Sequence, residues 1–284
     1  SFGGFEFDYI FVSAQRRRGE MEKKMNILFI GDIFGKTGRK MIETYLPKIV
    51  EKYSVECVIA NGENTSHGKG LLQKHYDELL SHGISLITMG NHTYSKKEIF
   101  EYIDEADKLI VPLNKPKAMP GVGSRVIEVK GKKIRVTNLL GLTFMDGKPQ
   151  NPFEAIDPVL EEDDSDIHII DFHGEATSEK IAFGYYVDGR VSAVLGTHTH
   201  VPTGDEKILP NGTAFQCDVG MTGPYESVIG CEKEGIIERS IKGIMTPFRV
   251  AEDEGQLCAT LLHFDGNKCT NIERIRIDPQ VKFK

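Results

Sequence analysis

The chain of 284 residues has no tryptophan, only five cysteines and no long uninterrupted apolar run. Because a membrane helix needs roughly 20 consecutive apolar residues, we expect no membrane-spanning segment and no membrane partner. The cysteines are odd in number, widely spaced and without a Cys-x-x-Cys pair. This argues against a disulfide framework or a zinc ribbon and fits a reducing cytosol, so we expect a cytoplasmic protein.

Positive charge is also in short supply, since 35 Lys and Arg face 42 Asp and Glu for a net charge of −7. Residues 1–24 hold five basic and four acidic residues, so the remainder carries −7 − 1 = −8. An acidic balance of this size disfavours a long nucleic acid as a partner. Residues 1–24 have neither helical nor secretory patterning, and we interpret them as an N-terminal extension, artificial or disordered, outside the fold.

The rest of the chain, residues 25–284, has the alternation of strand and helix patterns that is typical of an α/β protein. Hairpin patterns are added in its second half. We therefore predict one domain, a four-layer α-β-β-α sandwich of two packed mixed sheets. Strands are expected at 26–30, 55–60 and 84–89, helices at 38–53 and 71–81, and hairpins within 125–139, 207–216 and 256–277.

A further helix is predicted from Ser95, because Glu98 stands at the capping-box position three residues later, and it should continue to about residue 105. A small lid could be drawn from residues 95–125 or 220–250.

Acidic, amide and imidazole side chains follow five of the predicted strands. The most informative pair is His198 and His200, which close the strand at 191–195 with one residue between them. In a strand, residues i and i+2 point to the same face, so both imidazoles should reach one point beyond the strand end. In chain order the series is Asp32, Glu63-Asn64, Asn91-His92, His173 and His198-Thr199-His200.

Mixed nitrogen and oxygen ligands of this kind suit Mn²⁺, Fe²⁺ or Zn²⁺ better than Mg²⁺ or Ca²⁺. The series holds more ligands than one ion needs. A carboxylate shared between two ions roughly 3.5–4 Å apart would use them well.

Each member of the series has an ordinary alternative when taken alone. Asp32 could form a turn or cap a helix, and Glu63 could be an exposed loop acid. Asn91-His92 could be only a turn, and His173 is as readily structural as a ligand. The occurrence of all of them at strand ends favours a site.

Four other histidines are interpreted as structural or superficial. His75 and His82, seven residues apart on a predicted helix, are expected at the surface, whereas His168 and His263 lie within strands and are expected to be structural.

The segment at 31–37 also resembles a P-loop, but only three residues separate its first glycine from Gly-Lys-Thr, where the P-loop has four. Asp32 would bring a negative charge to the place where a phosphate should bind. A nucleotide triphosphatase is therefore disfavoured.

The ordered motifs Gly31-Asp32, Gly62-Glu63-Asn64, Gly90-Asn91-His92, His173 and Gly196–His200 resemble those of the calcineurin-like metallophosphoesterases. The segments at 171–180 and 218–225 make the chain most similar to the bacterial YmdB-like cyclic-nucleotide phosphodiesterases, from about residue 25 to 277. Phe34 stands where the superfamily usually has a histidine, and Glu63 replaces its bridging aspartate. The narrower branch shares both departures, which leave the first ion with one protein ligand fewer.

This resemblance implies a phosphodiesterase with two divalent metal ions that hydrolyses cyclic nucleotides or similar small phosphodiesters through a metal-bridging hydroxide. Iron or manganese is expected at the site, with zinc as the alternative. His92 would protonate the leaving alkoxide or hold the phosphoryl oxygens, and Asn64 would donate a hydrogen bond to a phosphate oxygen. The implied metal ligands are Asp32 and His200 for the first ion, Asn91, His173 and His198 for the second, and Glu63 between them.

The resemblance also implies a homodimer or homotetramer. Gly220–Ile229 is a candidate apolar surface patch, with packing over the chain's own core as an equal alternative. Since one sheet system can supply all the ligands, each active site should be complete in one subunit. Two alternatives stay open. One is a phosphomonoesterase or nuclease with the same dinuclear site, and the other is a non-catalytic regulatory protein of this fold.

Overall fold

The computed structural model describes residues 24–243 and 247–283, so the predicted N-terminal extension lies outside the described residues except for Lys24, which begins β1. The strands of the first half are β1 (Lys24–Ile30), β2 (Val55–Asn61), β3 (Leu86–Thr88), β4 (Leu109–Ile110), β5 (Ser124–Val129) and β6 (Lys132–Leu140). The second half adds β7 (Ile167–His173), β8 (Ala193–Thr197), β9 (Lys207–Ile208), β10 (Ala214–Gln216), β11 (Gly223–Pro224), β12 (Gly255–Asp265) and β13 (Lys268–Ile277). The helices are α2 (Gly35–Tyr53), α3 (Gln73–Ser81), α4 (Ile99–Tyr102), α5 (Pro152–Glu161), α6 (Thr177–Tyr186) and α7 (Lys233–Lys242).

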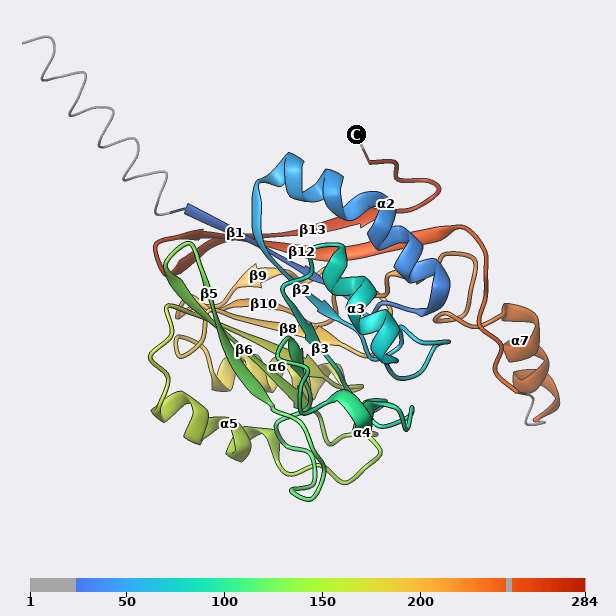
Figure 1. The fold of residues 1–284 in the computed structure, drawn as a ribbon, viewed down its shortest axis with the longest axis horizontal. Coiled ribbons are helices and arrows are strands. Elements are labelled where there is room, and N and C mark those ends of the chain that lie inside the picture. The colour runs from blue at the N-terminus through green and yellow to red at the C-terminus, as the bar shows by residue number, and fades with distance from the viewer. Residues whose placement is uncertain (1–23, 244–246, 284) are drawn as a thin grey trace, which may run out of the picture.

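These strands form two mixed sheets (Figure 1). The first has the order β11-β12-β1-β2-β3-β4, with β13 paired to β12, and the second has the order β5-β6-β7-β8-β10-β9. The strands β1 to β4 run parallel, as do β6, β7, β8 and β10. Since the carboxyl ends of parallel strands lie at one edge of a sheet, each sheet gathers its loops there.

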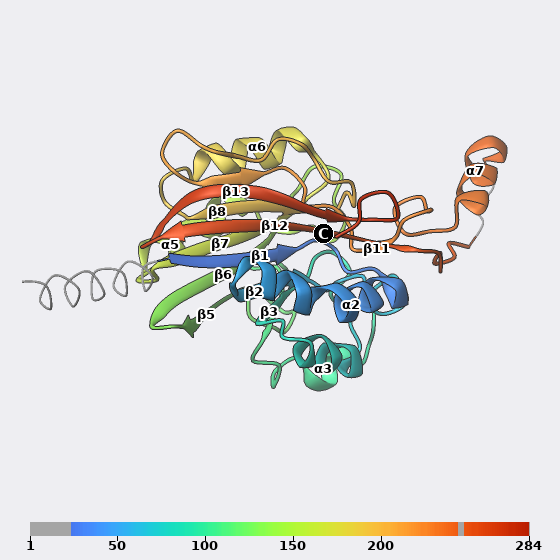
Figure 2. The same ribbon diagram turned by 90° about the horizontal axis from the view of Figure 1, so that it is seen from above.

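Successive side chains of a strand point to opposite faces of its sheet, and this places each sheet between two apolar layers. In β1, Ile27 and Phe29 enter the core between the two sheets, whereas Leu28 and Ile30 pack under the helices of the first sheet. A third core holds Phe172 of β7 beneath α5 and α6. Figure 2 shows α2 and α3 on one side of the paired sheets and α6 on the other. The predicted four-layer α-β-β-α sandwich is confirmed.

Two local predictions were wrong. The helix expected from Ser95 is only the single turn of α4, because the Glu98 carboxylate accepts a hydrogen bond from Gln73 N, 2.8 Å away, and caps the start of α3 instead. His75 was expected at the surface but is buried, with Nδ1 2.6 Å from the Ser66 hydroxyl. The loop before α3 covers this ring, and helical periodicity alone does not reveal such a cover.

The chain between β11 and β12 carries α7 on a part that projects from the body (Figures 1 and 2). This helix has no buried residue. Met221 of the predicted apolar patch is buried in the molecule's own core, whereas Ile229 is exposed. The predicted patch is therefore at the surface only in part, and further exposed apolar side chains follow it in α7 at Ile237 and Ile241.

Within the described part of the chain, no helix combines the length and apolar character required to cross a bilayer. All five cysteines are unpaired, and Cys57 is a fully buried core residue of β2, as expected.

Candidate metal centre

The strand ends that carry the predicted site residues come from both sheets and meet at one edge of the sandwich. Asp32, Glu63 and Asn91 follow β1, β2 and β3 of the first sheet. His173 ends β7, and the pair of histidines follows β8 of the second sheet. Asp32, Glu63 and His173 are at most 1% exposed, so this edge buries polar groups rather than presenting them to solvent.

The tightest cluster surrounds Nε2 of His173. Glu63 Oε1 lies 2.9 Å from this nitrogen, Asn91 Oδ1 lies 3.0 Å from it and His198 Nδ1 lies 3.1 Å from it. Glu63, His173 and His198 form the group of ligand-type residues that could hold a metal ion among the residues the structure describes. Four potential ligand atoms from four strand ends thus converge on one point.

A second group lies beside this cluster. His200 Nε2 is 3.7 Å from Asp32 Oδ1 and 3.3 Å from Asn64 Oδ1. Asp32 Oδ2 accepts a hydrogen bond from His198 N at 3.1 Å. Asp32 Oδ1 is buried and has no hydrogen-bond partner among the described residues. An unpaired buried carboxylate oxygen is costly, and a bound cation would satisfy it.

Neighbouring groups orient the three histidines. His173 Nδ1 is 2.8 Å from the Thr197 hydroxyl, and His200 Nδ1 is 2.9 Å from the carbonyl oxygen of Ile229. His198 Nε2 is 3.1 Å from a Glu175 carboxylate oxygen. A carbonyl or carboxylate oxygen can only accept, so each outer nitrogen of His198 and His200 carries the proton. The inner nitrogens are left with free lone pairs, which is the form that binds metal.

The prediction that His198 and His200 point to one face of a strand was wrong. The strand β8 ends at Thr197, and His198 and His200 have positive φ angles of 100° and 67°. Their side chains diverge, with His198 beside His173 and His200 beside Asp32. Such left-handed conformations are uncommon outside glycine and concentrate at functional sites.

Burial sets the electrostatics of the centre. It raises the pKa of Asp32 and of Glu63, although neighbouring histidines oppose this. It also lowers the pKa of His173 and of His198 to about 4. Both shifts disfavour the charged form, so the protein alone does not compensate the two buried carboxylates.

Two residues shape the space around the centre. A Cβ at Gly90 would overlap the Glu63 carboxylate and the His173 ring, so only glycine fits there. Phe34 packs edge-on against His200, with ring centroids 5.6 Å apart at 77°. The residue that replaces the usual histidine of the superfamily is therefore a packing partner of a site histidine.

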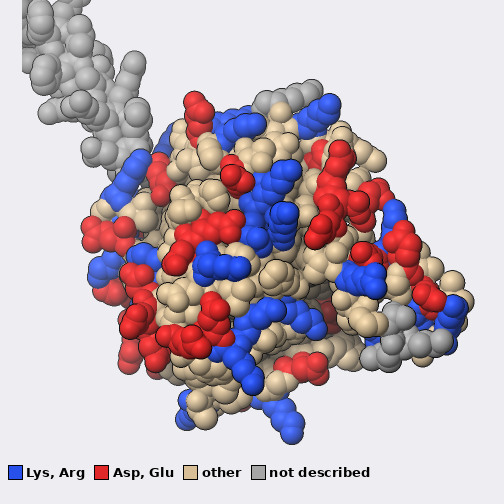
Figure 3. Space-filling view, turned by 45° about the vertical axis from the view of Figure 1, so that its right-hand side comes forward, with Lys and Arg blue, Asp and Glu red and all other residues tan. Residues whose placement is uncertain are grey.

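His92 stands beside the cluster rather than in it. Its backbone N donates to Glu63 Oε2 at 2.8 Å, while its half-buried ring has the Ser95 hydroxyl 3.5 Å from Nδ1. Burial lowers the pKa of His92, against the opposing effect of Glu63. Figure 3, which brings this side of the molecule forward, shows a hollow between the body and the projecting α7 region, with Lys and Arg side chains on its rim.

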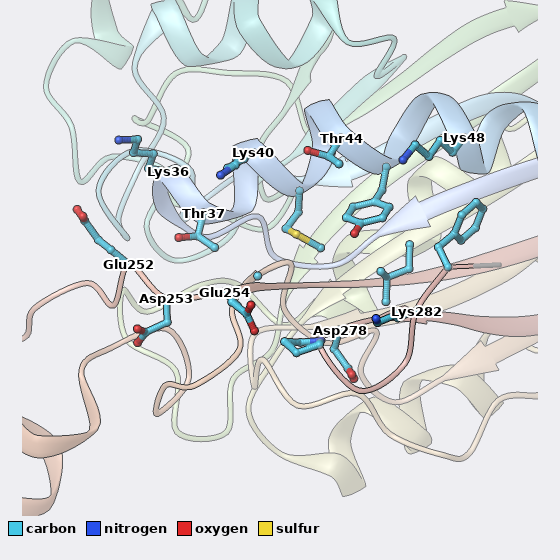
Figure 4. A pocket seen from close by; sticks show the side chains of 16 residues that line it. Lys36, Thr37, Lys40, Thr44, Lys48, Glu252, Asp253, Glu254, Asp278 and Lys282 are labelled. Carbon is cyan, nitrogen blue, oxygen red and sulfur yellow. The ribbon is translucent and has the colours of Figure 1, made fainter.

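A groove of about 780 Å³ lies elsewhere, along the outer flank of α2 (Figure 4). Lys36, Lys40 and Lys48 line one side, and Glu252, Asp253 and Glu254 line the other. These opposite charges cancel, and no histidine or cysteine lines the groove. The backbone N–H groups of Gly31, Ile33 and Phe34 already donate to Cys258 O, Asn61 O and Thr222 O, which argues further against a phosphate loop at the start of α2.

Several polar residues beneath the site were not predicted from the sequence. Lys180 and Asp218 form a buried ion pair at 2.9 Å. Lys180 Nζ also donates to Thr197 O at 2.8 Å, and Asp218 accepts from Thr199 N at 3.0 Å. These contacts hold the backbone around His198. Asp171, Lys180 and Asp218 all belong to the two segments that suggested the narrower family, but nothing in the sequence indicated their roles.

Comparison with known proteins agrees with this geometry. A family model described as YmdB-like protein matches residues 28–275. The 2′,3′-cyclic-nucleotide 2′-phosphodiesterase of Bacillus subtilis is 46% identical over 263 residues, which are 91% of this chain and 99% of that protein.

Two solved structures extend the comparison. The crystal structure of a novel phosphatase from Mycoplasma pneumoniae has 41% identity and a TM-score of 0.86, covering 91% of this chain and 96% of its own. The NAD nucleotidase of Haemophilus influenzae shares the fold at 12% identity and a TM-score of 0.57, over 90% of this chain and 56% of its own.

Proposed function

Since this chain belongs to the YmdB-like protein family, we propose that it is a metal-dependent phosphodiesterase that opens 2′,3′-cyclic nucleotides or similar small cyclic phosphodiesters. The observation that carries the proposal is the buried Asp32 oxygen without a partner beside the cluster of Glu63, His173 and His198. A cation supplies what that cluster lacks, and phosphodiester hydrolysis is the chemistry named for the relative from Bacillus subtilis.

We assign the ligands by their proximity. Asp32 and His200 would hold one ion, Asn91, His173 and His198 a second, and Glu63 would lie between them. The free lone pairs on the inner histidine nitrogens support this set, and the mixed donors favour iron or manganese, with zinc possible. Two such ions would offset the charge of a phosphate and lower the pKa of bound water.

The remaining residues act on the substrate. His92 would give a proton to the 2′ oxygen as the bond from that oxygen to phosphorus breaks and water adds to phosphorus. The products are a free 2′ hydroxyl and a 3′ phosphate. Asn64 donates one amide hydrogen to Gly68 O at 3.0 Å, so its second amide hydrogen is available for a phosphate oxygen.

The decisive test combines metal analysis with activity. Protein purified without chelator should contain more than one equivalent of Mn, Fe or Zn, and chelation should abolish hydrolysis of 2′,3′-cyclic nucleotides until metal is restored. A metal-free chain that stays inactive with each metal supplied would refute the proposal.

A substrate panel separates the alternatives. We expect turnover of 2′,3′-cyclic nucleotides and of p-nitrophenyl phosphodiesters, with the nucleoside 3′-phosphate as product of the former. Faster turnover of phosphomonoesters would indicate a phosphatase, cleavage of long single strands would indicate a nuclease, and metal binding without turnover would indicate a regulatory protein.

We further propose that the protein assembles as a homodimer or homotetramer, with α7 in the contact. A ten-residue helix is marginal by itself, and α7 leaves Ile237 52% exposed and Ile241 78% exposed. Light scattering of the full chain should give a multiple of 31.7 kDa, and Ile237→Glu with Ile241→Glu should reduce it. A monomer mass for the unaltered chain at micromolar concentration would refute assembly.

Each site should be complete within one subunit, because one chain supplies all the proposed ligands. Mixing inactive Asp32→Asn and His200→Ala proteins should therefore not restore activity.

A further inference from the structure

The proposed function gives no role to Asp171, a fully buried carboxylate on β7 beneath the metal cluster. Three side chains donate hydrogen bonds to it. Asn61 Nδ2 lies 2.9 Å and Thr88 Oγ1 lies 2.5 Å from Asp171 Oδ2, and Thr197 Oγ1 lies 2.6 Å from Asp171 Oδ1. Asn61 and Thr88 belong to the first sheet and Thr197 to the second, so this carboxylate joins the two sheets.

The bond from Thr197 determines the state of His173. When Asp171 is ionised, the Thr197 hydroxyl gives its only hydrogen to it and can offer only a lone pair to His173 Nδ1, 2.8 Å away. This contact favours the neutral ring with its proton on Nδ1, against the pull of the Glu63 and Asn91 oxygens on Nε2. The unprotonated nitrogen is then Nε2, which faces Glu63 and Asn91.

We propose that Asp171 is a positioning residue that, through Thr197, fixes the tautomer of His173 and so makes Nε2 available to a metal ion. The inference rests on the proposed metal site, and it assigns a role to a residue that touches neither metal ligand atoms nor substrate. Partners of this outer kind fix the tautomer and ring orientation of metal-binding histidines in general.

The geometry predicts what Asp171→Asn would do. Asn61 cannot turn its amide, because Nδ2 also donates to Met89 O at 3.1 Å and Oδ1 accepts from Glu63 N at 3.2 Å. The oxygen of the amide introduced at position 171 must therefore face Asn61, and its NH₂ group must face Thr197. The Thr197 hydroxyl would then accept from position 171 and donate to His173 Nδ1. The ring proton moves to Nε2, where it blocks ligation.

The same strand offers a matched control. His168 lies at the other end of β7, with Nδ1 2.7 Å from Asp163 Oδ2 and Nε2 2.8 Å from the Thr137 hydroxyl. His168 thus has a carboxylate and a threonine hydroxyl beside it, as His173 has, and is similarly buried. It lies five positions from His173 along an extended strand, which corresponds to roughly 16 Å. Asp163→Asn removes a histidine-bound carboxylate without touching the metal cluster.

The experiment measures Mn²⁺ affinity by equilibrium dialysis of the metal-stripped full chain. We expect Asp171→Asn to weaken binding about 10–100-fold, as loss of an outer partner of a metal-binding histidine typically does, and Asp163→Asn to leave it unchanged. Thr197→Val should weaken binding in the same way, whereas Thr197→Ser, which keeps the hydroxyl, should restore it. Thermal melting of each variant identifies any that fail to fold, and the Thr197 pair then decides the result.

A second readout observes the tautomer itself. Long-range ¹H–¹⁵N correlation of the metal-free chain, with the His173 signal assigned by its loss in His173→Gln, should show the proton on Nδ1 in the unaltered protein and on Nε2 in Asp171→Asn. An unchanged tautomer together with unchanged Mn²⁺ affinity would overturn the inference. If the unaltered chain binds none of Mn, Fe or Zn, the proposed function fails, and an unchanged tautomer in Asp171→Asn would still separately overturn the role of Asp171.

Discussion

The two buried histidines of β7, His168 and His173, have similar neighbours, but the ring nitrogens of His173 face more potential metal ligands. His168 and His173 are 3% and 0% exposed, and each has a threonine hydroxyl and a carboxylate close to its ring. Each ring nitrogen of His168 has a single polar neighbour, the Asp163 carboxylate at Nδ1 and the Thr137 hydroxyl at Nε2. The inner nitrogen of His173 instead faces three ligand-type atoms at once.

Charge balance separates the two ends further. Asp163 has a cationic partner, Arg135, whose Nε lies 2.8 Å from Oδ1. In the ranges 24–243 and 247–283, no Lys or Arg forms an ion pair with Asp32 or Glu63. A buried histidine beside a carboxylate therefore occurs both in a structural pair and in the proposed metal site. The proposed metal site differs in that its carboxylates have no Lys or Arg partner among the described residues.

The largest expected effect comes from removing the central carboxylate. Glu63→Gln should lower hydrolysis of 2′,3′-cyclic nucleotides by at least about 100-fold, because it takes away the charge between the two proposed ions. Loss of an outer partner of a metal ligand typically costs about 10–100-fold, and loss of a proposed ligand should cost more. Metal analysis should find reduced occupancy in this variant and full occupancy in Asp163→Asn. Full occupancy in Glu63→Gln would mean that the carboxylate does not bind metal.

His92 tests whether a histidine beside the cluster has a different role from those within it. His92→Ala should keep both metals and reduce kcat by about 10²–10⁴-fold, the usual contribution of general acid catalysis. Steady-state kinetics and metal content of the same preparation check this. If the metals are lost as well, His92 is a ligand and the proposed role is wrong.

The pair of His168 and Asp163, at the other end of β7, should affect stability and not activity. Asp163→Asn leaves His168 and Arg135 without an ionised partner and should lower the free energy of unfolding by about 1–3 kcal/mol. Burial alone would raise the pKa of Asp163, but hydrogen bonds from His168, Ser165 and Arg135 outweigh it and hold that pKa well below its usual value.

This depressed pKa gives the effect of Asp163 a pH dependence. Its contribution to stability is present above the unfolded pKa of about 4 and is lost as the pH falls below it. Denaturant titrations should therefore show the gap between Asp163→Asn and the unaltered chain closing under acid. A gap that persists in full at low pH would contradict this account.

The smallest effect concerns His75, whose pKa burial and then Arg39 lower to about 4. The unfolded chain binds this proton near pH 6.5, so stability should fall as the pH drops from about 6.5 toward 4, by about 1 kcal/mol at pH 5 after allowance for solvent screening. His75→Gln should flatten this part of the stability profile.

The sequence by itself determined the layers of the fold and the five strand ends at which the site lies. Apolar periodicity depends on local spacing, and parallel strands carry their carboxyl ends to one edge whatever the side chains are. Asp32, Glu63, Asn91 and His173 could therefore be placed in advance. Which of them bind metal stays a prediction.

Only the tertiary structure decided how the side chains at that edge are aimed. The left-handed turn at His198 and His200 depends on Asp32, Lys180 and Asp218, which are distant in the chain. Likewise Glu98 caps a different helix from the one its spacing suggested. Hydrogen bonds between remote segments have no local period, so their partners become identifiable only once the two sheets are packed together.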